Sequence, residues 1–588
     1  MHASSKRTLW ELTAGQRLRY LAAIGAMAVG TVFLLSVPYV LKRALDALLT
    51  GQATMWQSLI PAAVTMVSFN AAYGGFTYLR GRWAAQASEG IVQQLRHRLY
   101  AHLERLPCSF HDHSDTGDLV QRCSSDVETI RVFLASQVVE IVRVSLFLLV
   151  AFPIMLSQDR RMTALSFCLI PMIIFFAVQF FRKVRALFQQ VDEAEGRLTT
   201  VLQENLTGIR VVRAFARQEF ETSKFLQRNG EFRDLEYRLF LALTNYWTLS
   251  DVLVFAQLGL VLIGGAYFVA EGQMTLGTWV LFWWLVRTII WPVRHIGRVL
   301  ADTGKATVSI GRIKEILMAE PESDEAKTDQ PVEGLIEVRN LTFSYDEGRK
   351  ALSDLTITIQ QGETIALLGP PGAGKSTFVN LLVRLYDYQQ GSIKIGGREL
   401  NTINRDSLRG AFGMVLQDPF LYSKTVRENV VIGRSAAADH EVEESAQAAD
   451  IHENICGFAE GYGTKVGERG VTLSGGQRQR LAIARALLKN PAFLVMDDSL
   501  SAVDTKTEAH ILRSLANRRG NQTTILIAHR LSSTRLADRI LVFDHGRLVQ
   551  QGSHDQLLLE DGAYRRLWRI QGTLEEEMAK DLSGGKRR

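Results

Sequence analysis

The stretch Gly369-Pro-Pro-Gly-Ala-Gly-Lys-Ser-Thr377 follows the apolar run Thr364–Leu368 and fits the Walker A pattern GxxxxGK[ST]. Its glycines let backbone N–H groups curl around phosphate oxygens, and the helix that follows points its positive end at the same charge. Lys375 supplies a cation to the outer phosphates, and Ser376 supplies a hydroxyl to Mg²⁺. Taken alone, the pattern also fits a glycine-rich turn. The residues expected to bind the phosphates are Gly369, Pro370, Pro371, Gly372, Ala373, Gly374, Lys375, Ser376 and Thr377.

Two further motifs follow in the order that a nucleotide-binding domain requires. Phe493-Leu-Val-Met-Asp497 is an apolar run that ends in a carboxylate, the Walker B pattern, which holds Mg²⁺ through water. Between the two Walker motifs lies Leu473-Ser-Gly-Gly-Gln477, the signature of the ATP-binding-cassette (ABC) family, which the chain therefore resembles. The resemblance implies that ATP and Mg²⁺ are bound. It also implies that a helix begins at the signature and faces the γ-phosphate bound to the opposite subunit. The residues at the start of that helix are Ser474, Gly475, Gly476 and Gln477.

Four more positions match the family in order and spacing. The resemblance implies that Tyr345 stacks on adenine, and that Gln417 senses the γ-phosphate and contacts the metal and the membrane domain. It implies that Asp504, in Ser-Ala-Val-Asp504, belongs to the D-loop and that His529 is the switch histidine. A single Tyr or His is more often a residue of no special role, but the combined order favours the family roles.

One position departs from the family pattern. The residue after the Walker B aspartate is usually Glu in the family, where it polarises the attacking water, and here it is Asp498. A carboxylate that is one methylene shorter is withdrawn by roughly 1.5 Å, and a misplacement of about 1 Å can cost about a hundredfold in rate. We therefore expect Asp498 to be a weak catalytic base and hydrolysis to be slow wherever this chain supplies both Walker motifs.

The first half of the chain holds six apolar runs near the roughly 20 residues that a membrane span needs. Buried helices of a soluble protein would instead show an amphipathic stripe. Two long, charged and helix-prone segments separate the second run from the third and the fourth from the fifth. Their Lys and Arg content predicts helices that extend into the cytoplasm. The six predicted spans are 20–42, 57–79, 133–156, 163–182, 249–270 and 276–294.

The two long segments contain stretches that resemble the intracellular loops of exporter-type family members. His113–Arg122 resembles the first loop, with a short coupling helix that docks on a nucleotide-binding domain, and Glu204–Phe215 resembles the second. A metal site at His111, Asp112, His113 and Asp115 is a less favoured alternative. Aromatic and polar residues at the fifth and sixth spans indicate a substrate cavity, with lipid-facing or interfacial anchoring as the alternative for Trp283 and Trp284. The cavity residues would be Asn245, Tyr246, Trp247, Phe282, Trp283, Trp284 and Arg287.

The fold class expected from these patterns is multidomain. An all-α six-helix transmembrane domain with long cytoplasmic helical extensions occupies residues 1–316, and a linker occupies 317–334. An α/β P-loop NTPase domain occupies 335–572, and a charged tail 573–588. Four cysteines without a CxxC pair argue against a disulfide framework or a zinc site. A net charge of +6 is explained by loops facing the cytoplasmic leaflet and does not indicate nucleic acid.

The family resemblance is closest to the degenerate-site subunit of bacterial heterodimeric multidrug exporters, which also have Asp before a Ser-Ala-Val-Asp run. It implies ATP-driven export of small hydrophobic or amphipathic compounds, multidrug or lipid-like, across the cytoplasmic (inner) membrane by alternating access. Hydrolysis would occur mainly at the site completed by a second half that carries the catalytic Glu. A homodimeric exporter with Asp498 as a weak base remains open, and so does an importer of metal chelates on the same fold.

Overall fold

The computed structural model describes residues 15–51, 54–322, 330–345, 348, 350–467, 470–520, 522–528 and 534–570. The chain divides into two compact units. The first comprises Met1–Arg105 and Ser114–Ala319, and the second comprises Leu106–His113 and Glu320–Arg588. The tail at 573–588 and residues 323–329 of the linker at 317–334 lie outside the described residues, so the domain boundaries above stay predictions.

The first unit is helical, and six helical stretches among its described residues are long and apolar enough to cross a membrane. They are Arg17–Leu49, Trp56–Leu103, Thr116–Gln158, Arg160–Thr207, Gln218–Ala270 and Leu276–Met318, which confirms the six predicted spans. The elements of this unit are α2 (Arg17–Leu49), α3 (Met55–Leu103), α5 (Thr116–Gln121), η1 (Arg122–Asp126), α6 (Val127–Val132), η2 (Phe133–Gln137), α7 (Val138–Gln158), α8 (Arg160–Phe167), α9 (Ile170–Thr207), α10 (Ile209–Ala214), α11 (Gln218–Ala270), α12 (Leu276–Arg294) and α13 (Ile296–Met318).

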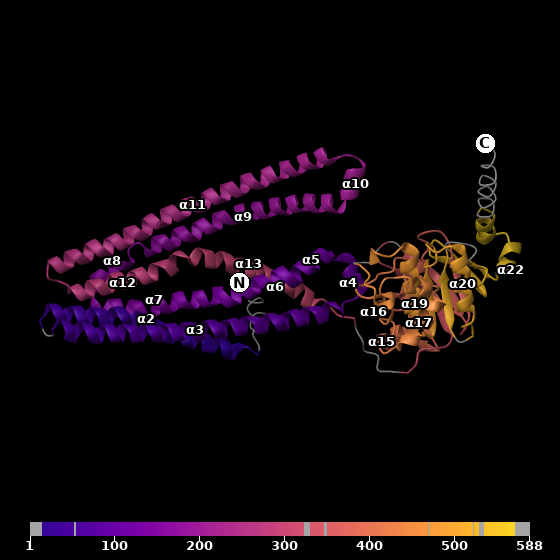
Figure 1. Cartoon of the computed structure of the whole chain (residues 1–588), viewed down its shortest axis with the longest axis horizontal. Coiled ribbons are helices and arrows are strands. Elements are labelled where there is room, and N and C mark those ends of the chain that lie inside the picture. Colours follow the sequence, from indigo (N-terminus) through magenta and orange to yellow (C-terminus); the bar gives the residue numbers. More distant parts are fainter. Residues whose placement is uncertain are drawn as a thin grey trace. The chain divides into compact units, whose positions relative to one another are not determined.

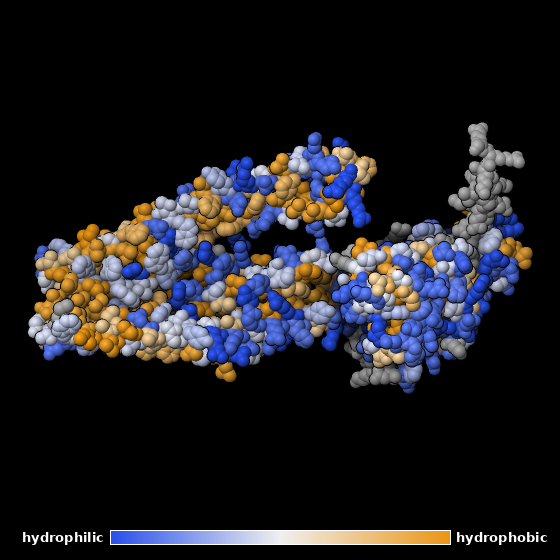
Figure 2. Space-filling model, in the orientation of Figure 1, coloured by the Kyte–Doolittle hydropathy of each residue, from blue (hydrophilic) through white to orange (hydrophobic). Residues whose placement is uncertain are grey.

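The helices are far longer than a bilayer requires, as the charged segments predicted. At 1.5 Å per residue, the 53 residues of α11 extend about 80 Å, more than twice the hydrocarbon thickness. Figure 1 shows α9 and α11 running side by side and joined by the short α10. In Figure 2, hydrophobic side chains dominate this unit near α8 and α12, and hydrophilic ones become frequent toward α10.

The core of the helical unit corrects the predicted cavity. Phe282 is completely buried among the helices, and Tyr246 is 2% exposed. The Tyr246 ring stacks on Phe180 at 4.2 Å between centroids, and its hydroxyl donates a hydrogen bond to the Arg294 carbonyl at 3.2 Å. Both side chains therefore pack the bundle instead of lining an open cavity, because a continuous apolar run does not reveal which face meets other helices.

The second unit is an α/β domain with two sheets, as predicted. The antiparallel sheet has the order β2-β1-β4-β5, and the six-stranded sheet has the order β10-β9-β3-β8-β7-β6. In the latter, β3, β7 and β8 are buried along their whole length, as parallel strands covered on both faces are. The strands are β1 (Ile336–Ser344), β2 (Lys350–Ile359), β3 (Thr364–Leu368), β4 (Gln390–Ile395), β5 (Arg398–Glu399), β6 (Phe412–Val415), β7 (Phe493–Asp497), β8 (Thr523–Ile527), β9 (Arg539–Asp544) and β10 (Arg547–Gly552).

The second unit also contains α4, a short helix that lies in the sequence of the membrane half. The docking helix was predicted within His113–Arg122, but the segment that belongs to this unit is Leu106–His113, immediately before it. The helices of the unit are α4 (Cys108–His113), α14 (Lys375–Leu382), η3 (Leu400–Thr402), α15 (Arg405–Ala411), α16 (Val426–Val430), α17 (Asp439–Ala448), α18 (His452–Cys456), η4 (Gly461–Gly463), α19 (Gly475–Leu488), α20 (Thr505–Ala516) and α22 (His554–Leu559).

Candidate functional site

The parallel strands bring the predicted nucleotide motifs to one edge of the six-stranded sheet. Neighbouring strands β3, β8, β7 and β6 are parallel, so their carboxyl ends lie together. β3 ends at the Walker A loop, β7 ends at Asp497, and β6 leads toward Gln417. Ligands of open parallel sheets bind outside this edge. His529, predicted as the switch residue after β8, lies outside the described residues.

The Walker A loop depends on glycine at two positions. Gly369 has φ +150° and Gly374 has φ +97°, a backbone region that side chains disfavour. A Cβ on Gly369 would stand 2.2 Å from the Phe543 carbonyl oxygen, and one on Gly374 would stand 2.7 Å from that of Ala351. The glycines therefore let the loop pass against β9 and β2 before α14 begins at Lys375.

Lys375 reaches back into the loop that precedes it. Its ammonium donates to the carbonyl oxygens of Gly369 at 2.8 Å and Pro370 at 3.0 Å. Burial lowers the pKa of this ammonium, while the nearby carboxylates of Asp497 and Asp498 act in the opposite direction. The cation is thus held where phosphate oxygens are expected, close to the Walker B carboxylates.

A pocket of about 570 Å³ opens beside the loop. Tyr345 and Thr377 line it, and the Tyr345 hydroxyl donates to the Thr377 hydroxyl at 3.2 Å. The sequence predicted both residues at the nucleotide. It did not predict Lys350 and His545, which also line the pocket. These two come from the start of β2 and from the β9–β10 turn, and only the sheet pairing brings them to the Walker A loop.

Asp498 has an unusual and firmly held backbone. Its φ is +44°, in the left-handed region, which Asp tolerates better than most residues. Its N–H donates to the Ile527 carbonyl at 3.1 Å, and its own carbonyl accepts from the Ser501 hydroxyl at 2.9 Å. These two hydrogen bonds hold the backbone on both sides and oppose a shift that would offset the missing methylene of the side chain.

The signature segment begins a helix with a reciprocal pair of hydrogen bonds. The Ser474 hydroxyl accepts from the Gln477 N–H at 3.3 Å, and the Ser474 N–H donates to the Gln477 side chain at 2.9 Å. This capping box leaves the remaining N–H groups at the start of α19 open to a ligand. A Cβ on Gly476 would stand 2.8 Å from the Ala502 carbonyl oxygen. Glycine thus allows the signature to lie directly on the D-loop.

Two other predicted residues occupy different situations. Gln417 is exposed in the segment after β6. Asp504 caps α20, accepting from the backbone N–H groups of Lys506 at 3.1 Å and Thr507 at 3.0 Å, and the Thr507 contact holds the pKa of this carboxyl low. Its side chain therefore has a structural role that the motif did not reveal.

The sequence did not predict a role for Gln479. Its amide oxygen accepts a hydrogen bond from the Ala502 N–H at 3.1 Å, which connects α19 to the D-loop.

The described residues fit a magnesium nucleotide. The loop holds the partly desolvated ammonium of Lys375, and Thr377 lines the pocket. Asp497 is buried and ends β7 at the same edge of the sheet. Tyr345 offers an aromatic face at the mouth. Ser376 and Asp497 have the oxygen chemistry that Mg²⁺ prefers. When bound, the ion would neutralise phosphate charge, and the residues of this chain would position the phosphates and exclude water.

The residues of the alternative metal site are engaged separately. Asp112 accepts a hydrogen bond from the Tyr386 hydroxyl, and Asp115 accepts from the Gly117 N–H at the start of α5. The Tyr386 ring meets Tyr345 edge to face at 4.9 Å between centroids. Within the second unit, α4 is thus one aromatic ring away from the nucleotide pocket.

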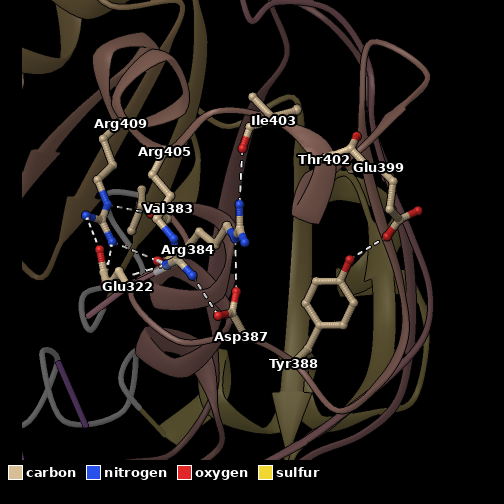
Figure 3. A network of polar contacts seen from close by, with 10 residues as sticks. All are labelled: Glu322, Val383, Arg384, Asp387, Tyr388, Glu399, Thr402, Ile403, Arg405 and Arg409. Carbon is tan, nitrogen blue, oxygen red and sulfur yellow. Dashed lines mark hydrogen bonds and ion pairs between the residues drawn. The ribbon is translucent and has the colours of Figure 1, made fainter. Parts of the chain in front are cut away.

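A polar network in the second unit anchors Glu322, near the start of the linker (Figure 3). Arg409 donates to both carboxylate oxygens of Glu322, each at 2.9 Å. Arg405 and Arg384 both donate to Asp387, at 2.7 and 2.9 Å. Burial acts to raise the pKa of Asp387, but these two arginine hydrogen bonds outweigh it and hold the pKa below its usual range. The start of the linker is therefore fixed to α15, which carries Arg409.

Comparisons with known proteins match both halves of the chain. Residues 20–293 match the family described as ABC transporter transmembrane region. Residues 352–501 match the family described as ABC transporter. The second match includes the Walker motifs and the signature segment.

Similar proteins cover nearly the full length. "Putative multidrug export ATP-binding/permease protein YgaD" of Bacillus subtilis is 33% identical over 553 residues, 91% of this chain and 94% of the relative. The ATP-dependent lipid A-core flippase of Syntrophus aciditrophicus is 31% identical over 568 residues, 96% of this chain and 94% of the relative. The solved structure of a bacterial Atm1-family ABC exporter with ATP bound is similar with a TM-score of 0.83 and 28% identity. The match covers 95% of this chain and 99% of that one.

Proposed function

We propose, from the premise that this chain belongs to the ABC transporter family, that it is one half of an exporter that moves hydrophobic or amphipathic compounds out of the cytoplasm. It is a multi-pass membrane protein with a cytoplasmic nucleotide-binding domain and an exporter fold, and its ATPase is coupled to transport. The direction and the compounds are the proposed part. They rest on relatives named for multidrug export and for lipid A-core flipping.

The observation that carries the finer proposal is the contrast around Asp498. The signature segment keeps its capping box and its contact with the D-loop, whereas the residue after Asp497 is shorter than the expected Glu and has a fixed backbone. Loss of about 1.5 Å of reach corresponds to roughly a hundredfold in rate, or about 2.7 kcal/mol of barrier. We infer that this half binds ATP at its own Walker motifs and hydrolyses it slowly.

A second half with a catalytic Glu would complete a competent site with this chain's signature. In that site Ser474 orients the start of α19, whose N–H groups and dipole face the phosphate held by the partner. This chain's Lys375, Thr377 and Tyr345 hold the other nucleotide. Gln417 and, by family resemblance, His529 would sense the γ-phosphate of that nucleotide.

The helical unit supports the need for a second half. The tip formed by the end of α9, by α10 and by the start of α11 exposes apolar side chains: Phe215 is 75% exposed, Leu206 is 64% and Val211 is 60%. The nucleotide-binding domain carries a groove of about 290 Å³ lined by apolar side chains that include Phe412, Met414 and Ile432. Exposed apolar tips of this kind mark interaction sites. We propose that the tip docks in the corresponding groove of the partner half.

Transport is tested in inside-out membrane vesicles that contain the chain with its candidate partner, the half encoded next to it if there is one. ATP-dependent accumulation of a fluorescent amphiphilic cation such as Hoechst 33342 is the expected result. Uptake should disappear in vesicles where both halves carry Lys→Ala in Walker A. ATP-dependent loss of the dye from preloaded inside-out vesicles would instead support the importer alternative.

Site usage is tested by trapping nucleotide with vanadate and photolabelling with 8-azido-ATP. The proposal expects trapped ADP mainly on the partner half, which holds the competent Walker motifs. Equal trapping on both halves, or efficient trapping by this chain alone, would favour the homodimeric exporter in which Asp498 is a sufficient base.

A further inference from the structure

A pocket of about 310 Å³ lies within the helical unit, between α9, α11 and α13. Its wall combines three aromatic rings, from Phe181, Phe188 and Trp247, with three cations. Neither the nucleotide motifs nor the substrate cavity predicted from the sequence explains why aromatic rings and cations gather here. Of the residues predicted for that cavity, only Trp247 contributes to the pocket.

The cations of the pocket are Arg185 on α9 and Arg298 and Lys305 on α13. Across the described ranges of the chain, none of the three forms an ion pair with a carboxylate. The Lys305 ammonium instead lies 5.5 Å from the centroid of the Phe188 ring. Charges in a confined, partly apolar site are stabilised by an opposite charge, so these cations are positioned to receive an anion.

The two carboxylates that line the pocket offset only part of its positive charge, although Asp302 interacts electrostatically with Lys305 and Arg298. Asp302 accepts a hydrogen bond from the side-chain amide of Gln137 at 2.8 Å, which directs this carboxylate to η2. Counting the three cations against Asp192 and Asp302 gives a formal charge of 3 − 2 = +1 for the lining. A group with a single negative charge matches this balance.

On all three helices the residues of the pocket lie next to the end of an apolar, membrane-spanning run. On α9 its residues follow the apolar run that ends near Phe181, and on α11 they directly precede the apolar run that begins near Leu249. On α13 they follow the apolar α12. Because α13 leads to the cytoplasmic domain, this level is the cytoplasmic border of the bilayer. Basic and aromatic side chains at that border suit a headgroup whose apolar body continues into the membrane.

We propose that this pocket is a binding site for an anionic amphiphile, a molecule with one phosphate or carboxylate held by Arg185, Arg298 and Lys305 and an apolar body against Phe188 and Trp247. All the residues that define it belong to this one chain. The same chemistry is offered by an anionic phospholipid of the inner leaflet and by a free anionic detergent-like compound. Binding needs no ATP hydrolysis, so the proposal stands or falls independently of export.

The test uses the full chain in a neutral detergent and measures bound ligand by native mass spectrometry. The probes are dioleoylphosphatidylglycerol, zwitterionic dioleoylphosphatidylcholine, dodecyl phosphate and inorganic phosphate. The variant carries Arg185→Gln with Arg298→Gln. The matched control carries Arg182→Gln with Lys183→Gln, two exposed cations of the same helix border that do not line the pocket.

The proposal expects at least a tenfold weaker binding of an anionic amphiphile in the pocket variant and less than a twofold change in the control. Loss confined to phosphatidylglycerol identifies a lipid site, and loss confined to dodecyl phosphate identifies a site for a soluble compound. Equal weakening in both variants would mean nonspecific charge at the border, and binding of inorganic phosphate as tight as that of dodecyl phosphate would exclude an amphiphile site. Either result overturns the proposal.

A second measurement covers the case in which the pocket variant folds poorly. Phosphatidylglycerol with dibrominated chains quenches nearby tryptophans, and the quenching lost on Trp247→Phe reports the pocket in the otherwise native chain. We expect this difference to vanish when brominated phosphatidylcholine replaces the anionic lipid. Equal quenching by the two lipids would contradict an anion-selective site.

Discussion

The two ends of the catalytic machinery in this cassette differ in how completely they are preserved. The signature end has a capped helix, glycines that lie against the D-loop, and a glutamine that ties the two together. The Walker end has an intact phosphate loop but places Asp498 after Asp497, on a backbone fixed at both sides. We propose that the domain is thus fit to complete a neighbour's site while its own site hydrolyses ATP slowly.

The difference teaches that binding and catalysis make separate demands on a sequence. Binding needs backbone N–H groups and a cation within broad limits, and Gly369, Gly374 and Lys375 provide them. Catalysis needs a carboxylate oxygen held within about 0.5 Å of its productive position beside the reacting water. A single methylene can therefore silence one function and leave the other intact.

Changing the signature should have the largest effect. Ser474→Arg removes the cap of α19 and fills the place where the partner's nucleotide is bound, so ATP hydrolysis by the pair should fall by roughly a hundredfold or more. Ser553→Arg is the matched control, because Ser553 forms the same capping box with Gln556 at α22, outside the site. The measurement is steady-state ATPase of the pair. A similar loss in both variants would show that the effect is one of stability.

Removal of the Walker A ammonium tests nucleotide binding at this chain's own Walker motifs. Lys375→Ala should weaken nucleotide binding to this chain by about tenfold or more, since a charge-assisted contact contributes about 1.5–3 kcal/mol. Hydrolysis by the pair should fall much less, because the proposal assigns the competent site to the partner. Fluorescent ATP binding and ATPase are measured together, with Lys394→Ala on β4 as the control. A loss of hydrolysis as large as that of Ser474→Arg would break the comparison.

Loss of the contact between Glu322 and Arg409 should lower the stability of the whole nucleotide-binding domain and should not act selectively on the Walker motifs or on the signature. Glu322→Gln breaks the two-point contact with Arg409, and Glu322 is only 14% exposed, so we expect a loss of about 1–3 kcal/mol of stability. Thermal unfolding followed by circular dichroism should show a lower midpoint, with nucleotide affinity retained. Glu320→Gln, at an exposed position two residues earlier, should leave the midpoint unchanged. Selective loss of one site's activity would refute a purely anchoring role.

The smallest effect is expected at α4. Tyr386→Phe removes a hydrogen bond to Asp112 and keeps the ring against Tyr345. ATP affinity should be unchanged, and hydrolysis by the pair should fall about twofold if α4 transmits closure, as one exposed hydrogen bond contributes about 1 kcal/mol or less. Tyr388→Phe is the control, because its hydroxyl donates to Glu399 away from α4. Equal rates in both variants would remove this contact from the coupling path.

The sequence predicted the architecture because its signals are local. Apolar runs marked the six spans, and charged segments between them marked the long helices. Buried runs before Gly369 and after Ala492 marked parallel strands whose ends meet at one edge. The residues that the sequence missed come from elsewhere in the fold. Lys350 and His545 reach the pocket only through strand pairing, and Gln479 reaches the D-loop only through helix packing.

Other errors have the same cause. Phe282 and Tyr246 were predicted to line a cavity because they are aromatic residues in spans, and they are packed in the core because those faces meet neighbouring helices. The sequence did not reveal that Leu106–His113, just before the predicted loop, belongs to the second unit, since no local pattern distinguishes α4 from α5. Whether a side chain faces a partner depends on contacts that no single segment encodes.

The most direct test of the central claim is the ATPase rate of this chain purified without a partner, as the native protein and as Asp498→Glu. The account predicts a native rate near background and a rise of about tenfold to a hundredfold in the variant, because the added methylene restores the reach of the carboxylate. Binding of fluorescent ATP should be the same in both. A native chain that hydrolyses ATP at an ordinary rate, unchanged by Asp498→Glu, would contradict the account and identify a homodimeric transporter with two working sites.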